Sequence, residues 1–343
     1  MLPDALSPEK IAVTSDSSAV RNLLELEFAV TRIPVSLRDI DLRPNAMIAV
    51  PGEVIPCTQS FLEALASSIS MPIPYAYQID SDLFKHNFDR RKIVKDRAVQ
   101  VCVVSQRAVG LAGAEYRPAR TIDVLEALDS INEDFWSFQK VSLSDVGVEI
   151  DLVSDDVAEP KPGDQIRLGV RIVNSETGDT GLKASLFSHR LVCSNGAVMR
   201  DTLGTIRWNY DNRVTYVSSI AKFGRGLLSL RASQGQLKSI YAEAVERPIL
   251  EEDIVRLWRR IRSAGRFTPE RTDQVLEITS EERLRFHSVV NERRAMGLPE
   301  VASDRDIYHV HNSITAAARS LPFHTRSRLE RIGGDVLSFY ASN

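Results

Sequence analysis

The feature that most constrains the fold is a change in the spacing of apolar residues along the chain. From Val146 onward apolar and polar residues alternate, and the alternation returns over residues 166–172. A period of two is typical of strands with one buried face. From Gly226 onward apolar residues recur at helical spacing, for example at Ile254 and Ile261. Strands followed by helices predict an α+β fold, in which an antiparallel sheet of hairpins precedes a helical C-terminal region.

The same patterns divide the chain into three predicted regions. These are a mixed α/β N-terminal region over 1–98, an antiparallel β core with two hairpins over 99–225, and a helical region packing on the sheet over 226–343. Turn-forming residues at 174–181 close the first hairpin, and Asp211-Asn212 close the second, whose returning strand includes Tyr216. Two prolines and a glycine predict a loop over 158–164.

Composition limits the location and the partners that can be expected. The chain has 343 residues, with 43 basic against 46 acidic residues and a net charge of −3, so any attraction to nucleic acid depends on local patches. Neither a signal peptide nor a run of ~18 apolar residues is present, which predicts a cytoplasmic protein without membrane contact. Cys57, Cys102 and Cys193 lie far apart, which predicts reduced, buried thiols without a disulfide framework or zinc site.

Common catalytic motifs are absent from the sequence. It contains no phosphate-binding GxxxxGK[ST] loop, GxSxG elbow, HExxH or GxGxxG motif. His309 and His311 would lie about 200° apart around a helix, too far for one metal ion. His189 and Cys193 would lie about 13 Å apart along a strand, too far for a catalytic dyad. We therefore predict no catalytic residue, metal or cofactor, while leaving open whether the protein is an enzyme.

Two basic segments are the clearer functional signal. Residues 89–97 hold five basic and two acidic residues, and residues 256–271 hold six arginines and one glutamate. Arg259, Arg262 and Arg266 would form one stripe on a helix, able to contact several phosphates or to face solvent or an acidic partner helix. The residues predicted to contact nucleic acid are Arg90, Arg91, Lys92, Arg167, Arg171, Lys183, Arg190, Trp208, Tyr210, Arg259, Arg262 and Arg266.

Two further interpretations stay open at this point. Trp208 and Tyr210 could stack on bases or belong to the core. Residues 187–196, "FSHRLVCSNG", read most simply as a strand that ends in an Asn195-Gly196 turn. If Arg190 instead points outward beside Arg167, the hairpin becomes a contact surface.

Two segments of the chain resemble phage- and plasmid-like proteins that are grouped as a domain of unknown function. These segments are residues 162–199 and 306–337, and residues 99–111 give weaker support. The resemblance singles out Asn174, Ser175, Glu176, Gly178, Cys193, Asn195, Gly196, Asn312 and Thr315, together with Gly163, Arg190, Ala318, Glu330 and Gly334. It implies an origin in a mobile element and an uncharacterised activity.

These observations favour a nucleic-acid-binding protein, with single-stranded DNA as the preferred partner, that binds or anneals strands in the replication or recombination of a mobile element. One alternative is an enzyme of uncharacterised type in which Glu176, His189, Arg190 and Asn312 converge. The other is a host-interaction or regulatory protein that binds a protein partner through its charged helices. Homo-oligomer formation is also left open.

Overall fold

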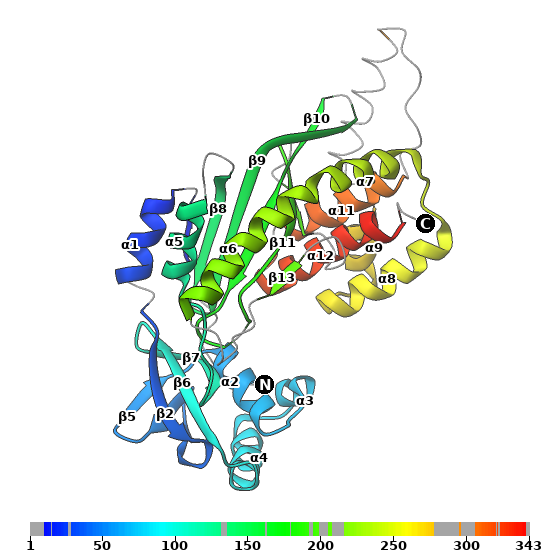
Figure 1. Ribbon diagram of the computed structural model, residues 1–343. Coiled ribbons are helices and arrows are strands. Elements are labelled where there is room, and N and C mark those ends of the chain that lie inside the picture. The colour runs from blue at the N-terminus through cyan, green and yellow to red at the C-terminus, as the bar shows by residue number, and fades with distance from the viewer. Residues whose placement is uncertain are drawn as a thin grey trace.

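The computed structural model has an α+β fold with two units, a larger one and a smaller one (Figure 1). The α+β prediction is therefore confirmed. The structure describes residues 10–14, 16–26, 29–131, 136–161, 163–178, 180–191, 195–198, 205–207, 216–277, 295, 306–319, 321 and 323–340.

The larger unit is built on an antiparallel sheet of seven described strands, in the order β1-β8-β9-β10-β11-β12, with β13 also paired to β11. The strands are β1 (Lys10–Thr14), β8 (Ser137–Ser144), β9 (Gly147–Lys161), β10 (Asp164–Asn174), β11 (Lys183–Arg190), β12 (Asn195–Val198) and β13 (Thr205–Arg207). Val170 lies opposite Leu186 and Leu152 in the register, so the alternating apolar residues of three strands share one face. This face carries the main core.

Helices cover the sheet and complete that core. They are α1 (Ser17–Leu26), α5 (Thr121–Ile131), α6 (Tyr216–Ala232), α7 (Gln234–Glu246), α8 (Glu251–Gly265), α9 (Pro269–Leu276), α11 (Ile307–Ala318) and α12 (Phe323–Tyr340). Figure 1 shows α6 and α7 crossing the sheet as one long rod. In α8, Leu257 and Ile261 are buried as their spacing predicts. Asp306 begins α11 by accepting a hydrogen bond from the backbone N–H of His309 at 2.8 Å.

The smaller unit comprises residues 31–113 and has its own core. Its elements are β2 (Thr31–Ser36), η1 (Leu37–Asp39), β3 (Asp41–Arg43), β4 (Met47–Val50), β5 (Glu53–Pro56), α2 (Gln59–Ser68), α3 (Ile73–Gln78), α4 (Ser81–Val94), β6 (Ala98–Val104) and β7 (Arg107–Gly113). They form two three-stranded antiparallel sheets, β2-β6-β7 and β3-β4-β5. Thr58 begins α2 by accepting a hydrogen bond from Phe61 N–H at 3.3 Å.

The structure changes the predicted region boundaries. Residues 99–113 are predicted to belong to the β core, but their strands pair with β2, because Val99, Val101 and Ala108 pack into the core of the smaller unit. Conversely, β1 pairs with β8 and so belongs to the larger unit. The chain therefore passes from the larger sheet into the smaller unit and then returns.

Two local predictions are also wrong. Tyr216 is predicted to lie in a returning strand but begins α6, in which Ile220, Phe223 and Leu227 are buried at helical spacing. Residues 158–161 lie in β9, whose last residue, Lys161, pairs with Asp164, so they do not form the predicted loop. No helix in the described ranges combines the length and the apolar character that crossing a bilayer requires.

Candidate nucleic-acid interface

A cleft of about 1210 Å³ lies between the smaller unit and the C-terminal helices of the larger one. Residues of α2 and β7, including Ser60 and Leu111, line one side. The end of α8 and the first turns of α12, including Gly265 and Thr325, line the other. The cleft is therefore assembled from segments that are far apart in the sequence.

The charge of this cleft is strongly one-sided. Within the described part of the chain, its charged lining residues are one glutamate, Glu63, and five arginines: Arg97, Arg266, Arg319, Arg326 and Arg328. Glu63 accepts hydrogen bonds from Tyr77 Oη and from Gln59 Nε2. Burial, followed by the hydrogen bond to Glu63, raises the pKa of Tyr77 to about 12, so the phenol stays protonated. Arg326 pairs with the buried Glu149 at 2.7 Å. The other four arginines still outnumber Glu63, so the cleft has a net positive charge although the whole chain is slightly acidic.

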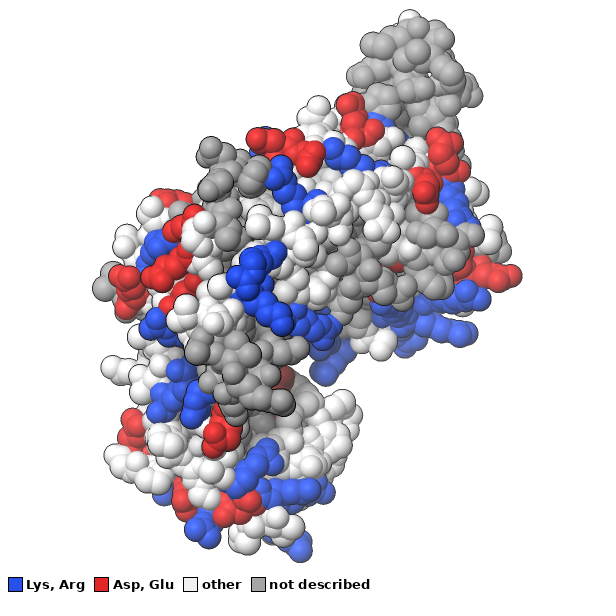
Figure 2. All heavy atoms as spheres, in the orientation of Figure 1, with Lys and Arg blue, Asp and Glu red and all other residues white. Residues whose placement is uncertain are grey.

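Helix α8 extends this charge beyond the cleft. Because Leu257 and Ile261 are buried, Arg259 and Arg262 face outward, and both are exposed. The predicted arginine stripe is therefore present on the surface. Figure 2 shows Lys and Arg side chains gathered over α8, on the side of the larger unit that faces the smaller one.

Arg266 connects the stripe to the cleft. It ends α8 in a left-handed conformation with a φ of 52°, and its backbone N–H donates to the carbonyl of Arg262. Its guanidinium lies 5.7 Å from the centre of the Tyr77 ring, on α3 of the smaller unit. A single arginine therefore reaches from one unit to the other.

The basic cluster on α4 lies outside the cleft lining. Arg91 donates to the carbonyl of Ser70 at 3.0 Å, and Lys92 donates to that of Ile40 at 2.8 Å. These two side chains hold α4 against its own unit, while Arg90 is exposed. Arg97, at the end of the same basic segment, does line the cleft, although it is not among the predicted contacts.

The prediction of an exposed basic face on the first hairpin is wrong. Arg171 is only 3% exposed and Arg190 only 5%. Arg171 pairs with Asp151 through Nε at 2.5 Å and also contacts Glu330, whereas Arg190 Nε donates to Asp164 at 2.6 Å. Carboxylates from neighbouring elements thus occupy both guanidinium groups.

Two further predicted contacts do not line the cleft. Arg167 and Lys183 are half-buried on β10 and β11, outside its lining. Trp208, Tyr210 and Cys193 lie outside the described residues. Cys57 and Cys102 are free and buried, and burial raises the pKa of Cys57 to about 12 and that of Cys102 to about 11.

Residues 187–190 and 195–196 belong to two paired strands of the sheet. Asn195 and Gly196 are predicted to form a turn, but they lie in β12, opposite Arg190 and His189 of β11. His189 and Arg190 therefore point to opposite faces of the sheet. Burial lowers the pKa of His189 to about 4, so the ring is neutral at neutral pH.

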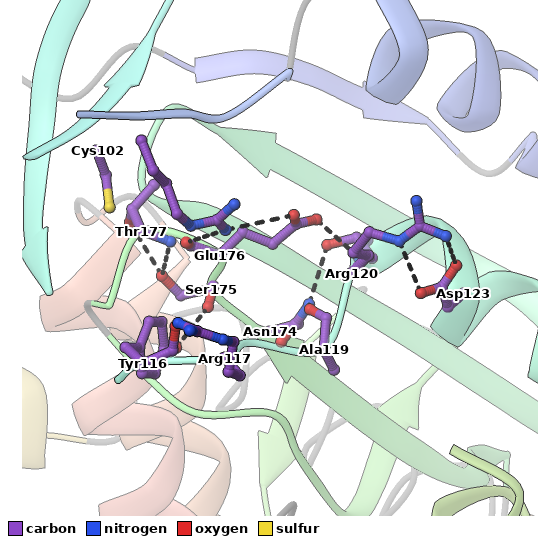
Figure 3. A network of polar contacts seen from close by, with 12 residues as sticks. Cys102, Tyr116, Arg117, Ala119, Arg120, Asp123, Asn174, Ser175, Glu176 and Thr177 are labelled. Atoms are coloured by element: carbon purple, nitrogen blue, oxygen red, sulfur yellow. Dashed lines mark hydrogen bonds and ion pairs between the residues drawn. The ribbon is translucent and has the colours of Figure 1, made fainter. Parts of the chain in front are cut away.

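The residues singled out at 174–178 form a polar network where the two units meet (Figure 3). Asn174 Nδ2 donates to the carbonyl of Ala119 at 2.9 Å and to Thr121 Oγ1 at 3.0 Å. Glu176 Oε1 accepts from the backbone N–H of Thr121 at 2.7 Å, and its carbonyl accepts from Arg32 of β2 at 2.9 Å. This network fixes the larger unit to the smaller one.

Two neighbours of this network make further contacts, one within the larger unit and one with the smaller unit. Ser175 Oγ donates to the carbonyl of Val146 at 2.7 Å. Gly178 has a φ of 91° and lies against Ala112 of β7, a backbone position that favours glycine. The polar residues of 174–178 are therefore explained by contacts within the larger unit and by the contact of Glu176 with Arg32 of the smaller unit.

The side chains named for an enzyme do not form one site. Glu176 follows the end of β10, whereas Arg190 lies opposite Ile166 near its beginning, about 25 Å away by strand rise. Asn312 is buried on α11, and Thr315 Oγ1 donates to the carbonyl of His311 at 3.1 Å. No cluster of His, Cys, Asp or Glu within the described ranges has the arrangement of a metal site.

Asn174→Ala is expected to lower the free energy of unfolding by about 1–2 kcal/mol, because two buried acceptors lose their donor. The buried, unpaired Oδ1 of Asn174 is removed as well, which offsets part of the cost. Urea denaturation measures the change. Asn87→Ala on α4, where the amide makes only a 3.4 Å contact with Tyr75, serves as the control and should change little. Equal stability of both variants would contradict the assigned role of Asn174.

Comparisons with known protein families, with curated proteins and with solved structures give no match for this chain. The resemblance to phage- and plasmid-like proteins therefore stays a prediction.

Proposed function

We propose that the chain binds single-stranded nucleic acid in the arginine-lined cleft, with the arginine stripe of α8 extending the binding surface. The observation that carries the proposal is the charge of the cleft. Among the described residues, five arginines and one glutamate line it, with one of the arginines, Arg326, paired to Glu149, in a chain whose net charge is −3. Guanidinium groups gathered in this way attract a phosphate backbone and release its counterions on binding.

The size and lining of the cleft favour a single strand. Its volume of about 1210 Å³ is only slightly above the ~300–1,000 Å³ of small-molecule pockets. A space of this size suits a few nucleotides of a single strand. Hydroxyl groups of Ser60, Ser67, Ser142 and Thr325 also line the cleft and can donate to phosphate or sugar oxygens.

Phosphate contacts carry no base information, so we expect binding without strong sequence preference. Together with the resemblance at 162–199 and 306–337, this supports a role in binding or annealing single strands during the replication or recombination of a mobile element.

Reversing charge at Arg266 and Arg328 tests the proposal, since both residues are exposed and line the cleft from α8 and α12. Fluorescence anisotropy with a labelled single-stranded oligonucleotide is measured at several salt concentrations. We expect R266E/R328E to bind at least tenfold more weakly. The slope of log affinity against log salt concentration should become shallower by roughly 0.7 for each phosphate that the variant no longer neutralises.

A matched control reverses two charges elsewhere. Lys222 and Arg225 are exposed on α6 and do not line the cleft, so K222E/R225E should bind almost as well as the parent. Equally weakened binding in both variants would indicate general charge attraction rather than this cleft. A parent that binds no oligonucleotide would overturn the proposal and favour the protein-interaction or enzyme alternatives. Tighter binding of duplex DNA than of single-stranded DNA would contradict the proposed single-stranded ligand. Tighter binding of single-stranded RNA would identify RNA as that ligand.

A further inference from the structure

A second pocket, of about 560 Å³, lies on the opposite face of β6 from the arginine-lined cleft. Val99 lines the cleft and Gln100 lines this pocket. Consecutive residues of a strand point to opposite faces, so the two spaces are separated by the sheet itself. The volume falls within the ~300–1,000 Å³ typical of small-molecule sites.

Three arginines and no acidic residue line this pocket within the described part of the chain: Arg32, Arg117 and Arg120. Asp123 holds Arg120 through Nε at 2.8 Å, and Glu176 lies 3.9 Å from Arg32. Arg117 instead donates to two main-chain carbonyls, those of Ala114 and Tyr116, both at 3.1 Å. No carboxylate among the described residues pairs with Arg117, so the pocket favours an anion.

Two aromatic rings complete the lining. Tyr116 donates through its hydroxyl to the carbonyl of Ser175 at 3.0 Å. Tyr216 donates to Asp123 Oδ2 at 2.5 Å and accepts from the backbone N–H of Arg120 at 2.7 Å. Burial, followed by the bond to Asp123, raises the pKa of Tyr216, so its hydroxyl keeps the proton that it donates. Anchored hydroxyls fix both rings before any ligand arrives, which lowers the entropy cost of binding.

Figure 3 shows how these groups are placed. Arg117 and Tyr116 lie together beside Ser175, and Arg120 is directed toward Asp123 and away from Arg117. Arg120 is thus held by its own partner. Arg117 and Arg32 are the cations whose charge is least balanced, and Arg32 Nε has no hydrogen-bond partner among the described residues.

We propose that this pocket binds a nucleoside phosphate, with the base packed against the tyrosine rings and the phosphates contacted by Arg117 and Arg32. A planar base matches fixed aromatic faces, and a phosphate matches guanidinium groups. This inference stands independently of the proposed cleft function. A nucleoside phosphate can be a free nucleotide or the 5′-phosphorylated end of a strand. The experiment below distinguishes these two ligands.

Isothermal titration calorimetry of the full chain tests the site with adenosine triphosphate, inorganic triphosphate and a 5′-phosphorylated oligonucleotide. We expect adenosine triphosphate to bind at least tenfold more tightly than inorganic triphosphate. Arg117→Gln should weaken nucleotide binding at least fivefold. Tyr116→Leu should weaken it further, whereas Tyr116→Phe, which keeps the ring and loses only the hydroxyl anchor, should weaken it less than Tyr116→Leu. Arg90→Gln, an exposed arginine of the smaller unit, is the matched control.

The outcomes separate the two sites. R117Q should leave oligonucleotide binding in the cleft unchanged, and R266E/R328E should leave nucleotide binding unchanged. Thermal melting checks that each variant is folded, and if Y116L unfolds, R117Q and Y116F still decide the question. Equal affinity for inorganic and adenosine triphosphate, or normal nucleotide binding by R117Q, would overturn the proposal. If the 5′-phosphorylated oligonucleotide binds and adenosine triphosphate does not, the ligand of this pocket is the phosphorylated end of a strand.

Discussion

Replacing Arg171 by methionine is expected to lower the free energy of unfolding by roughly 3–5 kcal/mol, because it leaves buried carboxylates without their cation. Arg171 binds Asp151 through Nε and Nη2 at 2.5 and 2.7 Å and also contacts Glu330 of α12. Burial by itself would lower the pKa of Arg171, but the nearby carboxylates hold it well above its usual value. Denaturant unfolding of the parent and R171M measures the decrease.

Arg167→Met is the matched control for this prediction. Arg167 lies on the same strand, four residues from Arg171 and on the same face, but is half-buried, with no buried carboxylate paired to it within the described ranges. We expect R167M to change the free energy of unfolding by less than about 1 kcal/mol. If R171M were no less stable than R167M, the ion pairs around Arg171 would not hold α12 to the sheet.

The parts of the fold that the sequence predicted depend on local patterns. The alternation at 166–172 places apolar side chains on one face whatever the neighbouring strands are, and β10 forms there. Likewise, the spacing of Leu257 and Ile261 determines which side of α8 is buried and so leaves Arg259 and Arg262 outside. Periodicity is informative in such segments because the residues of one strand or helix determine which of its faces is buried.

Contacts between distant segments could not be predicted in this way. Arg171 has the same alternation as an exposed strand residue, and its burial depends on Asp151 of the neighbouring strand and on Glu330, 159 residues later in the chain. The cleft combines Arg97, Arg266 and Arg328, which no motif connects. Glu176 is singled out by resemblance, but the structure gives it a partner in the smaller unit, Arg32. The polar turn residues of this hairpin serve a contact between units rather than a local turn alone.

The stability of the protein should fall as the pH is lowered from about 6.5 to about 4, in part through His311. This ring is buried, and its Nδ1 lies 2.9 Å from the carbonyl of Gly333. Burial lowers the pKa of His311 to about 4, and the positive charge of Arg190 acts in the same direction, although the Gly333 contact and Asp164 oppose it. The folded state therefore holds the neutral ring.

The unfolded chain takes up the proton first, near pH 6.5, so this contribution is complete above that pH and is lost progressively as the pH falls through about 4. The difference between these two pKa values corresponds to roughly 3 kcal/mol. Glu330 acts in the opposite direction, because burial raises its pKa to about 7 and the folded state then favours its protonated form. Comparison with a histidine variant isolates the contribution of His311, since both proteins keep Glu330.

His311→Asn keeps a donor for the carbonyl of Gly333 but removes the titrating ring. Unfolding in urea is measured for the parent and H311N at intervals from pH 7.5 to 4. The free energy of unfolding of the parent, minus that of H311N, should decrease by roughly 3 kcal/mol toward low pH, whatever its value at neutral pH. His86→Asn, at an exposed position on α4, is the control and should give a difference that stays constant. A constant difference for H311N as well would mean that His311 titrates alike in the folded and unfolded chain, contrary to its burial among the rings of Tyr241 and Tyr308.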